Sequence, residues 1–321
     1  MSMGYLYGCL SAFLWGLKPS TIKKINSNVI VVQLGTGIGV LLFSIIVFLC
    51  TFNQSYTDLT SQLGYKIFLF SFFSGLCWAV GQFFQFYAYK LLSTSIGFGL
   101  TTATTLIANA LFSVIVFKDW TTTYQLSLGF SAIFVIILGS LLTIYKSKNT
   151  EIKNIENTKS KKDYVIGIIV SLITCIFFML YSGLLRFVTI ENVSSTSTLL
   201  PHGIGTFVGT IFAIIFIIIF QYFKHKKDKA YDVMSLKDIK VIYSIIPGLL
   251  SSGGNFLMII TNSLLGSAIG FTLTQMAVVI STIISLFILK EYKEKTKLEN
   301  ILTVIGILII LSGGIMIGFT K

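Results

Sequence analysis

Long apolar stretches separated by short polar connections run through the whole chain. A bilayer core is crossed by roughly 17–25 apolar residues in a helix, and the runs here are continuous rather than alternating like barrel strands. The pattern predicts an all-α polytopic membrane protein with about ten transmembrane helices. Their predicted ranges are 3–19, 30–51, 66–88, 94–117, 124–145, 164–185, 199–222, 241–261, 267–289 and 298–319.

The three prolines refine these predicted helices. We expect Pro19 to end the first helix. Pro201 falls near the start of the seventh helix, where its missing N–H is tolerated. Pro247 falls inside the eighth helix and predicts a kink or break there.

Composition excludes several classes of protein. Hydrophobic residues make up 54% of the chain and charged residues 11%, and the charges cluster between the apolar stretches. This distribution excludes an ordinary soluble enzyme, a disordered chain and a nucleic-acid binder. Four Cys without a CxxC spacing and two His predict no metal site. No catalytic motif is present, so we expect neither enzyme activity nor a cofactor.

Basic residues lie mostly on one side of the predicted topology. The odd-numbered connections share one side and hold 20 of the 24 Lys and Arg, Lys18 included. Because basic connections stay in the cytoplasm, we expect a cell-membrane protein with both termini outside. The net charge of +12 then sets orientation and is no sign of a nucleic-acid partner.

An internal repeat relates the two halves of the chain. Residues 75–117 and 248–290 align without a gap. The informative pairs are Gly75/Gly248, Gly81/Gly254, Gly97/Gly270, Thr101/Thr274 and the amides Gln82/Asn255. Helices 3–4 thus match helices 8–9, and five helices per half make the second half enter the membrane inverted. Inverted repeats are typical of transporters, with the substrate between the halves; a duplicated bundle without transport is the alternative.

The domain organisation follows from this repeat. We expect a first five-helix repeat over 1–145, a charged cytoplasmic linker over 146–163 and a second five-helix repeat over 164–321.

Several segments carry a family resemblance. They are GQFFQF at 81–86, LPHGIG at 200–205 and FTLTQMAVVIST at 271–282. Over nearly the whole chain the sequence resembles the glucose/ribose porter family of the drug/metabolite transporter superfamily, and within it the bacterial glucose uptake permeases. The resemblance implies a ten-helix sugar importer that could be coupled to protons. Two positions depart from the family pattern: His202 replaces the usual Gln, and Lys18 with Pro19 interrupts a run that is typically apolar.

The span interiors indicate the kind of solute. None of the twelve Asp and Glu lies at the centre of a predicted span. This argues against exporters that bind cations through a central Glu, and it leaves no obvious carboxylate to relay protons. Amides, hydroxyls and aromatic rings remain, which suits a neutral polyol. We therefore expect a secondary transporter that imports a neutral sugar of glucose or ribose type by alternating access.

Two other functions stay open at this level. An exporter of amino acids or other small metabolites from the same superfamily would also have a neutral cavity. A scaffold or sensor that moves no solute is the third hypothesis, from a different class of protein.

Polar and aromatic residues within the spans are the candidate sugar ligands, because intramembrane polar groups cluster at functional pathways. Trp78, Gln82 and Gln85 share one face of the third helix through their spacing. The remaining candidates lie in helices 4, 7, 8 and 9 and are Thr101, His202, Asn255, Thr274 and Gln275. Amides and threonines also join neighbouring helices or bond their own backbone. His202 is expected at the outer end of helix 7, where the alternative interpretation is a structural residue at the membrane interface whose hydrogen bonds are satisfied. Trp15 could likewise be a structural residue at the interface.

Overall fold

The computed structural model describes residues 2–92, 94–145, 161–191, 193–224, 236–288 and 296–320, and the regular elements within them are all helical. The elements of the first half are α1 (Ser2–Ile25), α2 (Val29–Cys50), α3 (Phe52–Thr60), α4 (Gly64–Leu92), α5 (Thr94–Phe112), the π-helical turn η1 (Ser113–Phe117) and α6 (Thr123–Ile144). Those of the second half are α8 (Lys161–Thr189), α9 (Ser195–Lys224), α10 (Lys240–Tyr243), α11 (Ile245–Leu265), α12 (Ser267–Thr274), α13 (Ala277–Phe287) and α14 (Lys297–Gly318).

The predicted all-α membrane architecture is confirmed. Nine helical segments among the described residues are long and apolar enough to cross a membrane. The remaining predicted span, 3–19, corresponds to α1, a helix of 24 residues that carries Lys18, Lys23 and Lys24 in its second half. The short helix α3 was not predicted. Residues 146–160 of the predicted linker lie outside the described residues.

The prolines act differently from the sequence predictions, and Pro201 is the seventh residue of α9, beyond its first turn. The prediction that Pro19 ends the first helix is wrong, because α1 continues through it to Ile25. The interruption in the eighth span lies at Ser244, between α10 and α11, so Pro247 falls in the first turn of α11. The missing N–H of a proline costs no helical hydrogen bond there.

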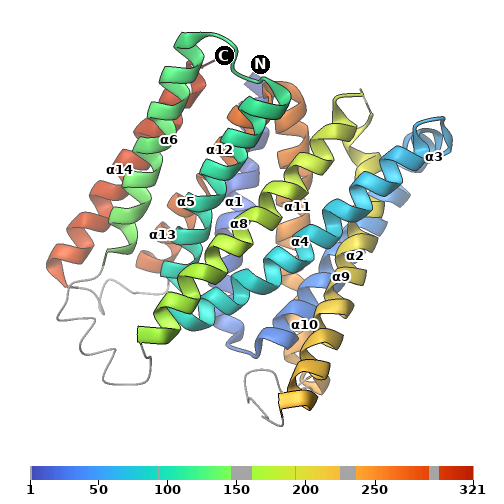
Figure 1. The fold of residues 1–321 in the computed structure, drawn as a ribbon, viewed down its shortest axis with the longest axis horizontal. Helices are drawn as coiled ribbons and strands as arrows, with labels where there is room; N and C mark the ends of the chain where they lie inside the picture. The colour runs from blue at the N-terminus through green and yellow to red at the C-terminus, as the bar shows by residue number, and fades with distance from the viewer. Residues whose placement is uncertain are drawn as a thin grey trace.

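The helices pack in pairs that join the two halves. In the right part of the view, α4 packs against α8 and α9, and α2 packs against α9 and α11 (Figure 1). The helix α1 lies along α11 and α13, while α5 lies along α8. The pair α6 and α14 forms the left edge of the bundle (Figure 1). Each half is therefore held mainly by helices of the other half.

Glycines bring the backbones of these pairs into direct contact. A Cβ added to Gly75 on α4 would lie 2.1 Å from the carbonyl oxygen of His202 on α9. A Cβ on Gly248 of α11 would lie 2.3 Å from the carbonyl oxygen of Thr36 on α2. Gly139 of α6 and Gly306 of α14 approach each other in the same way. Small residues of this kind allow close helix packing in lipid, where apolar burial gives little driving force.

Both chain ends lie at one end of the bundle, which we call the terminal end (Figure 1). The Tyr5 hydroxyl of α1 donates a hydrogen bond to the carbonyl oxygen of Gly318 at the end of α14, at 3.2 Å. The helix α3 lies at the terminal end as well (Figure 1). Lys23, Lys24 and Lys90 occupy the last turns of α1 and α4 at the opposite end.

Polar side chains point inwards and apolar ones outwards, as expected for a protein surrounded by lipid. Ser, Thr, Asn and Gln make up most of the buried polar residues. Large apolar side chains cover the outside, among them Phe212 and Phe216 on α9 and Leu308 and Ile315 on α14. The interior therefore contains hydrogen-bonding groups that a purely structural core would not need.

We predict that Gly75→Ala lowers the stability of the bundle, because the new methyl group would overlap the α9 backbone. Overpacking of this kind costs about 1–3 kcal/mol, which a lower thermal unfolding midpoint in detergent would report. Gly253→Ala is the control, since its nearest contact is the side-chain atom Cδ1 of Leu14 at 3.1 Å. Equal midpoints for the two variants would contradict the close α4–α9 contact.

Candidate functional site

A small cavity lies between helices of the two halves, and we call it the central cavity. Its volume is about 50 Å³, enough for a few water molecules and far below the roughly 300 Å³ at which ligand pockets begin. Helices α1, α4 and α5 of the first half and α8, α12 and α13 of the second provide its walls. The lining residues are Trp15, Lys18, Trp78, Gln85, Phe98, Thr101, Thr102, Thr105, Phe178, Tyr181, Phe271, Gln275 and Ala277.

A chain of polar side chains forms one wall of the central cavity. The Lys18 ammonium group donates a hydrogen bond to Oε1 of Gln82. The amide of Gln82 donates to Oε1 of Gln85 at 3.0 Å, and the Gln85 amide donates to the Thr101 hydroxyl at 3.2 Å. The Lys18 Nζ also lies 5.3 Å from the centre of the Trp78 ring. Three helices are thus joined by side chains that stand next to the cavity.

Another part of the cavity wall is formed where the ninth span is interrupted. The helix α12 ends at Thr274 and α13 begins at Ala277, so Gln275 lies at the break. No hydrogen bond joins the Gln275 side chain to another described residue, although the residue is only 7% exposed. The hydroxyl of Thr105, which lines the cavity from α5, is buried and also has no partner among the described residues. Such unpaired buried groups are rare unless they have a ligand or water.

Tyr181 connects the cavity to a second polar layer. Its hydroxyl donates to Oδ1 of Asn255 at 3.4 Å, and its ring centre lies 5.9 Å from that of His202. His202 is fully buried, with Nδ1 3.2 Å from the Ser74 hydroxyl. Its ring also meets Trp78 edge to face at 6.5 Å. Asn255 and His202 therefore support cavity-lining rings without lining the cavity themselves.

The structure separates the predicted site residues that line the central cavity from those that lie behind its wall or turn away from it. Trp78, Gln85, Thr101 and Gln275 line the central cavity. Gln82 lies directly behind this wall through its bonds to Lys18 and Gln85. The others are one layer back or turned away: Asn255, His202 and Thr274.

Two of these positions differ from the sequence predictions. His202 was expected at the outer end of its helix, but it is the eighth residue of α9 and is enclosed by α4 and α8. The Thr274 hydroxyl donates to the carbonyl oxygen of Phe271 in its own helix at 2.7 Å, so it bonds its backbone rather than the cavity.

Sequence reasoning misplaced one residue and missed others. Lys18 was counted with a cytoplasmic connection, but it lines the central cavity and is only 7% exposed. Trp15, one turn earlier, lines the cavity too and packs edge to face against Phe271 at 6.2 Å. A lysine one turn after a tryptophan in an apolar run is unusual and could have indicated from the sequence that Lys18 lies inside the bundle. Tyr181 gave no signal, because a single tyrosine in an apolar helix is common.

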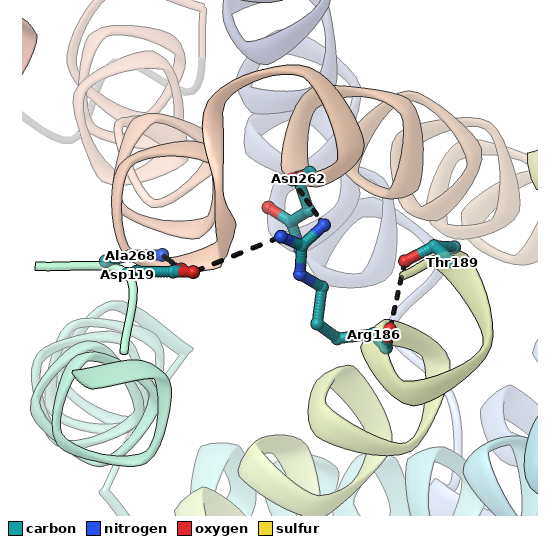
Figure 2. A network of polar contacts seen from close by, with 5 residues as sticks. All are labelled: Asp119, Arg186, Thr189, Asn262 and Ala268. Atoms are coloured by element: carbon teal, nitrogen blue, oxygen red, sulfur yellow. Dashed lines mark hydrogen bonds and ion pairs between the residues drawn. The ribbon is translucent and has the colours of Figure 1, made fainter. Parts of the chain in front are cut away.

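A second polar cluster lies at the terminal end of the bundle, and Figure 2 shows its residues. Arg186 on α8 donates from Nη1 to the carbonyl oxygen of Asn262 at 3.0 Å, and its Nη2 lies 4.0 Å from Oδ1 of Asp119. The other Asp119 oxygen accepts the Ala268 N–H at 2.9 Å. Gly266, at φ +83°, makes the turn that presents this N–H. The connections α5–α6 and α11–α12 are thereby joined to α8.

This cluster lies close to the central cavity along the chain. Arg186 follows Tyr181 by five residues, roughly 7–8 Å along the helix axis at 1.5 Å per residue. The guanidinium group also lies 6.0 Å from the ring centre of Phe117. The cluster therefore joins the two halves at the terminal end, five residues beyond the cavity-lining Tyr181 along α8.

Comparisons with known proteins agree on one family and one fold. The model of a family described as sugar transport protein matches residues 6–320. The glucose uptake protein GlcU of Bacillus subtilis strain 168 is 33% identical over 99% of both chains. A Listeria monocytogenes protein named for sugar uptake is 34% identical over 99% of this chain and 100% of its own length. One crystal structure matches with a TM-score of 0.66 at 15% identity, over 98% of this chain and 96% of the other, and that likeness concerns the fold alone.

Proposed function

The chain belongs to the sugar transport protein family, and on this basis we propose that it imports a neutral sugar of glucose or ribose type across the cell membrane by alternating access. The observation that carries the proposal is the central cavity between the two halves. Its walls combine amides, hydroxyls and aromatic rings. These are the groups that bind the hydroxyls of a sugar and stack on its apolar faces.

Unpaired polar atoms support the assignment of this cavity to a ligand. The Thr105 hydroxyl is fully buried without a partner among the described residues, and the Gln275 side chain, 7% exposed at the cavity, makes no hydrogen bond to a described residue. A bound sugar would supply hydrogen bonds to both, and each buried group left unsatisfied costs about 1–3 kcal/mol. Because the cavity is smaller than a monosaccharide, its walls must move apart for binding.

Equivalent contacts in the two halves support the proposed inverted repeat. Gly75 contacts α9, the seventh span, and its equivalent in the repeat, Gly248, contacts α2, the second span. The second and seventh spans are themselves equivalent in the proposed repeat. Gly81 meets Phe178 of the sixth span, and Gly254 meets Trp15 of the first. Each of these glycine contacts in one half thus has an equivalent contact in the other half. Such a pair of halves can rock around a site between them.

The polar cluster at the terminal end is suited to act as a gate in alternating access. If the terminal end faces the outside, as the distribution of basic residues favours, the Arg186–Asp119–Asn262 cluster closes the path to the outside. Import would require this cluster to separate and re-form in each cycle. The break in the ninth span at Gln275 lies at the cavity, where discontinuous helices are typical of transporters.

Uptake of labelled sugars by the purified protein in proteoliposomes tests the proposal. Saturable uptake of glucose or ribose is the expected result, and uptake of amino acids without any sugar would favour the exporter alternative instead. Repeating the measurement with an imposed pH gradient separates proton-coupled import, which the gradient accelerates, from facilitated diffusion, which it leaves unchanged.

We predict that Gln85→Ala and Gln275→Ala each lower the rate of sugar uptake by about tenfold or more, because each removes an amide from the cavity wall. Gln54→Ala is the matched control, since Gln54 is exposed and bonds only Asp58 on α3. Thermal unfolding in detergent shows whether the variants stay folded. Wild-type uptake kinetics in both cavity variants would remove these amides from the site.

We predict that Arg186→Gln increases the access of water-soluble reagents to the cavity from outside, because it breaks the ion pair that seals the terminal end. The measurement is the labelling rate of Thr105→Cys, in a background without the native cysteines, by a membrane-impermeant maleimide on whole cells. A several-fold faster reaction is expected.

Lys66→Gln provides the control for this labelling experiment. It breaks the other described ion pair at the same end, Lys66 to Glu191 at 2.5 Å, whose side chains are 28% and 43% exposed. Exposed pairs contribute little stability, so the labelling rate should stay near that of the parent. Equal rates for both variants would show that the Arg186 cluster is no gate.

A further inference from the structure

A single lysine side chain reaches the central cavity from α1. Lys18 is only 7% exposed and lines the cavity together with Trp15 and Gln85. Its ammonium group bonds the Gln82 amide oxygen and lies 5.3 and 5.7 Å from the ring centres of Trp78 and Phe86. These contacts hold the cation in place at the cavity wall, but they supply no negative charge.

No carboxylate compensates this charge within the described residues. The described acidic side chains pair elsewhere or lie at helix ends, as Asp119 does with Arg186 at the terminal end. The other titratable groups near Lys18 are Tyr181, which also lines the cavity, and His202, which lies behind the Trp78 ring. A buried charge without a counter-charge is costly in a membrane and marks a substrate pathway.

We propose that the central cavity also takes sugar acids, and that the carboxylate of the bound sugar pairs with the Lys18 ammonium group. This inference rests on the proposed sugar transport and extends it to a further class of substrate. The sugar ring would use the same amides, hydroxyls and aromatic faces as a neutral sugar. The carboxylate would supply the charge that Lys18 lacks.

The charge of the cavity selects among anionic sugars. Lys18 is the one basic side chain among the lining residues of the described chain, and Arg186 is already engaged with Asp119 and Asn262. One ammonium group neutralises the single charge of a carboxylate. A phosphate ester carries nearly two negative charges at neutral pH, so it would leave an unpaired charge in the cavity. The assignment is therefore a carboxylate rather than a phosphorylated sugar.

Binding of four matched ligands to the full-length protein in nanodiscs tests the assignment. Glucose and glucuronate differ only at C6, the methyl ester of glucuronate removes the charge, and glucose 6-phosphate carries the larger charge. Quenching of tryptophan fluorescence reports binding, because Trp15 and Trp78 line the cavity. We expect glucuronate to bind about tenfold more tightly than glucose or the ester, and glucose 6-phosphate to bind more weakly than glucuronate.

Variants at Lys18 attribute this preference to its charge. In Lys18→Gln the ratio of glucuronate to glucose affinity should fall to about one or below, and in Lys18→Arg it should stay well above one. The ratio is informative even where absolute affinities change.

Each contrary result has a distinct meaning. Glucose binding without a preference for glucuronate, or a preference that Lys18→Gln retains, overturns the role of Lys18 and leaves sugar transport standing. Tighter binding of glucose 6-phosphate overturns the choice of a carboxylate. Failure of every sugar to bind overturns both this inference and the proposed function.

Discussion

Backbone contact through glycine is the constraint on which the bundle depends. In lipid, apolar side chains gain little by leaving one apolar surrounding for another, so helices associate through close packing and polar contacts. Gly75 and Gly205 join α4 to α9, while Gly39 and Gly248 join α2 to α11. These four helices form a closely packed unit. Within this unit α4 also lines the cavity, and the other lining helices, α1, α5, α8, α12 and α13, pack against or beside the unit.

The packing contacts and the cavity wall use different residues, even on α4, which provides Gly75 to the former and Gln85 to the latter. The supporting helices meet through backbone atoms that tolerate no added methyl group, whereas the cavity wall consists of side chains that can rearrange. Gln82, Asn255 and His202 lie between the two layers. They bond or contact Lys18, Tyr181 and Trp78. These contacts offset part of the cost of their burial, while Nδ2 of Asn255 has no hydrogen-bond partner among the described residues.

Basic side chains have different roles in different parts of the molecule. Most lysines lie in connections, where their number sets the expected orientation. Lys18 has a different role, because α1 continues through Pro19 and places the Lys18 side chain inside the bundle. The same holds for Arg186, which belongs to the poorly charged side but joins both halves across the terminal end (Figure 2). Position relative to neighbouring helices, rather than composition, decides what each cation does.

The sequence by itself determined the all-α membrane architecture and the approximate ends of the spans, because a bilayer imposes a length and an apolar composition that can be counted along one chain. It also selected Trp78, Gln85, Thr101 and Gln275, since polar residues are rare enough in spans to stand out. It could not separate these from Thr274 or His202, because spacing along one helix does not say which neighbour faces it. Only the tertiary structure placed Lys18 and Tyr181 at the cavity and joined Asp119 to Arg186. Those contacts arise between residues far apart in the chain, and the packing of several helices decides them together.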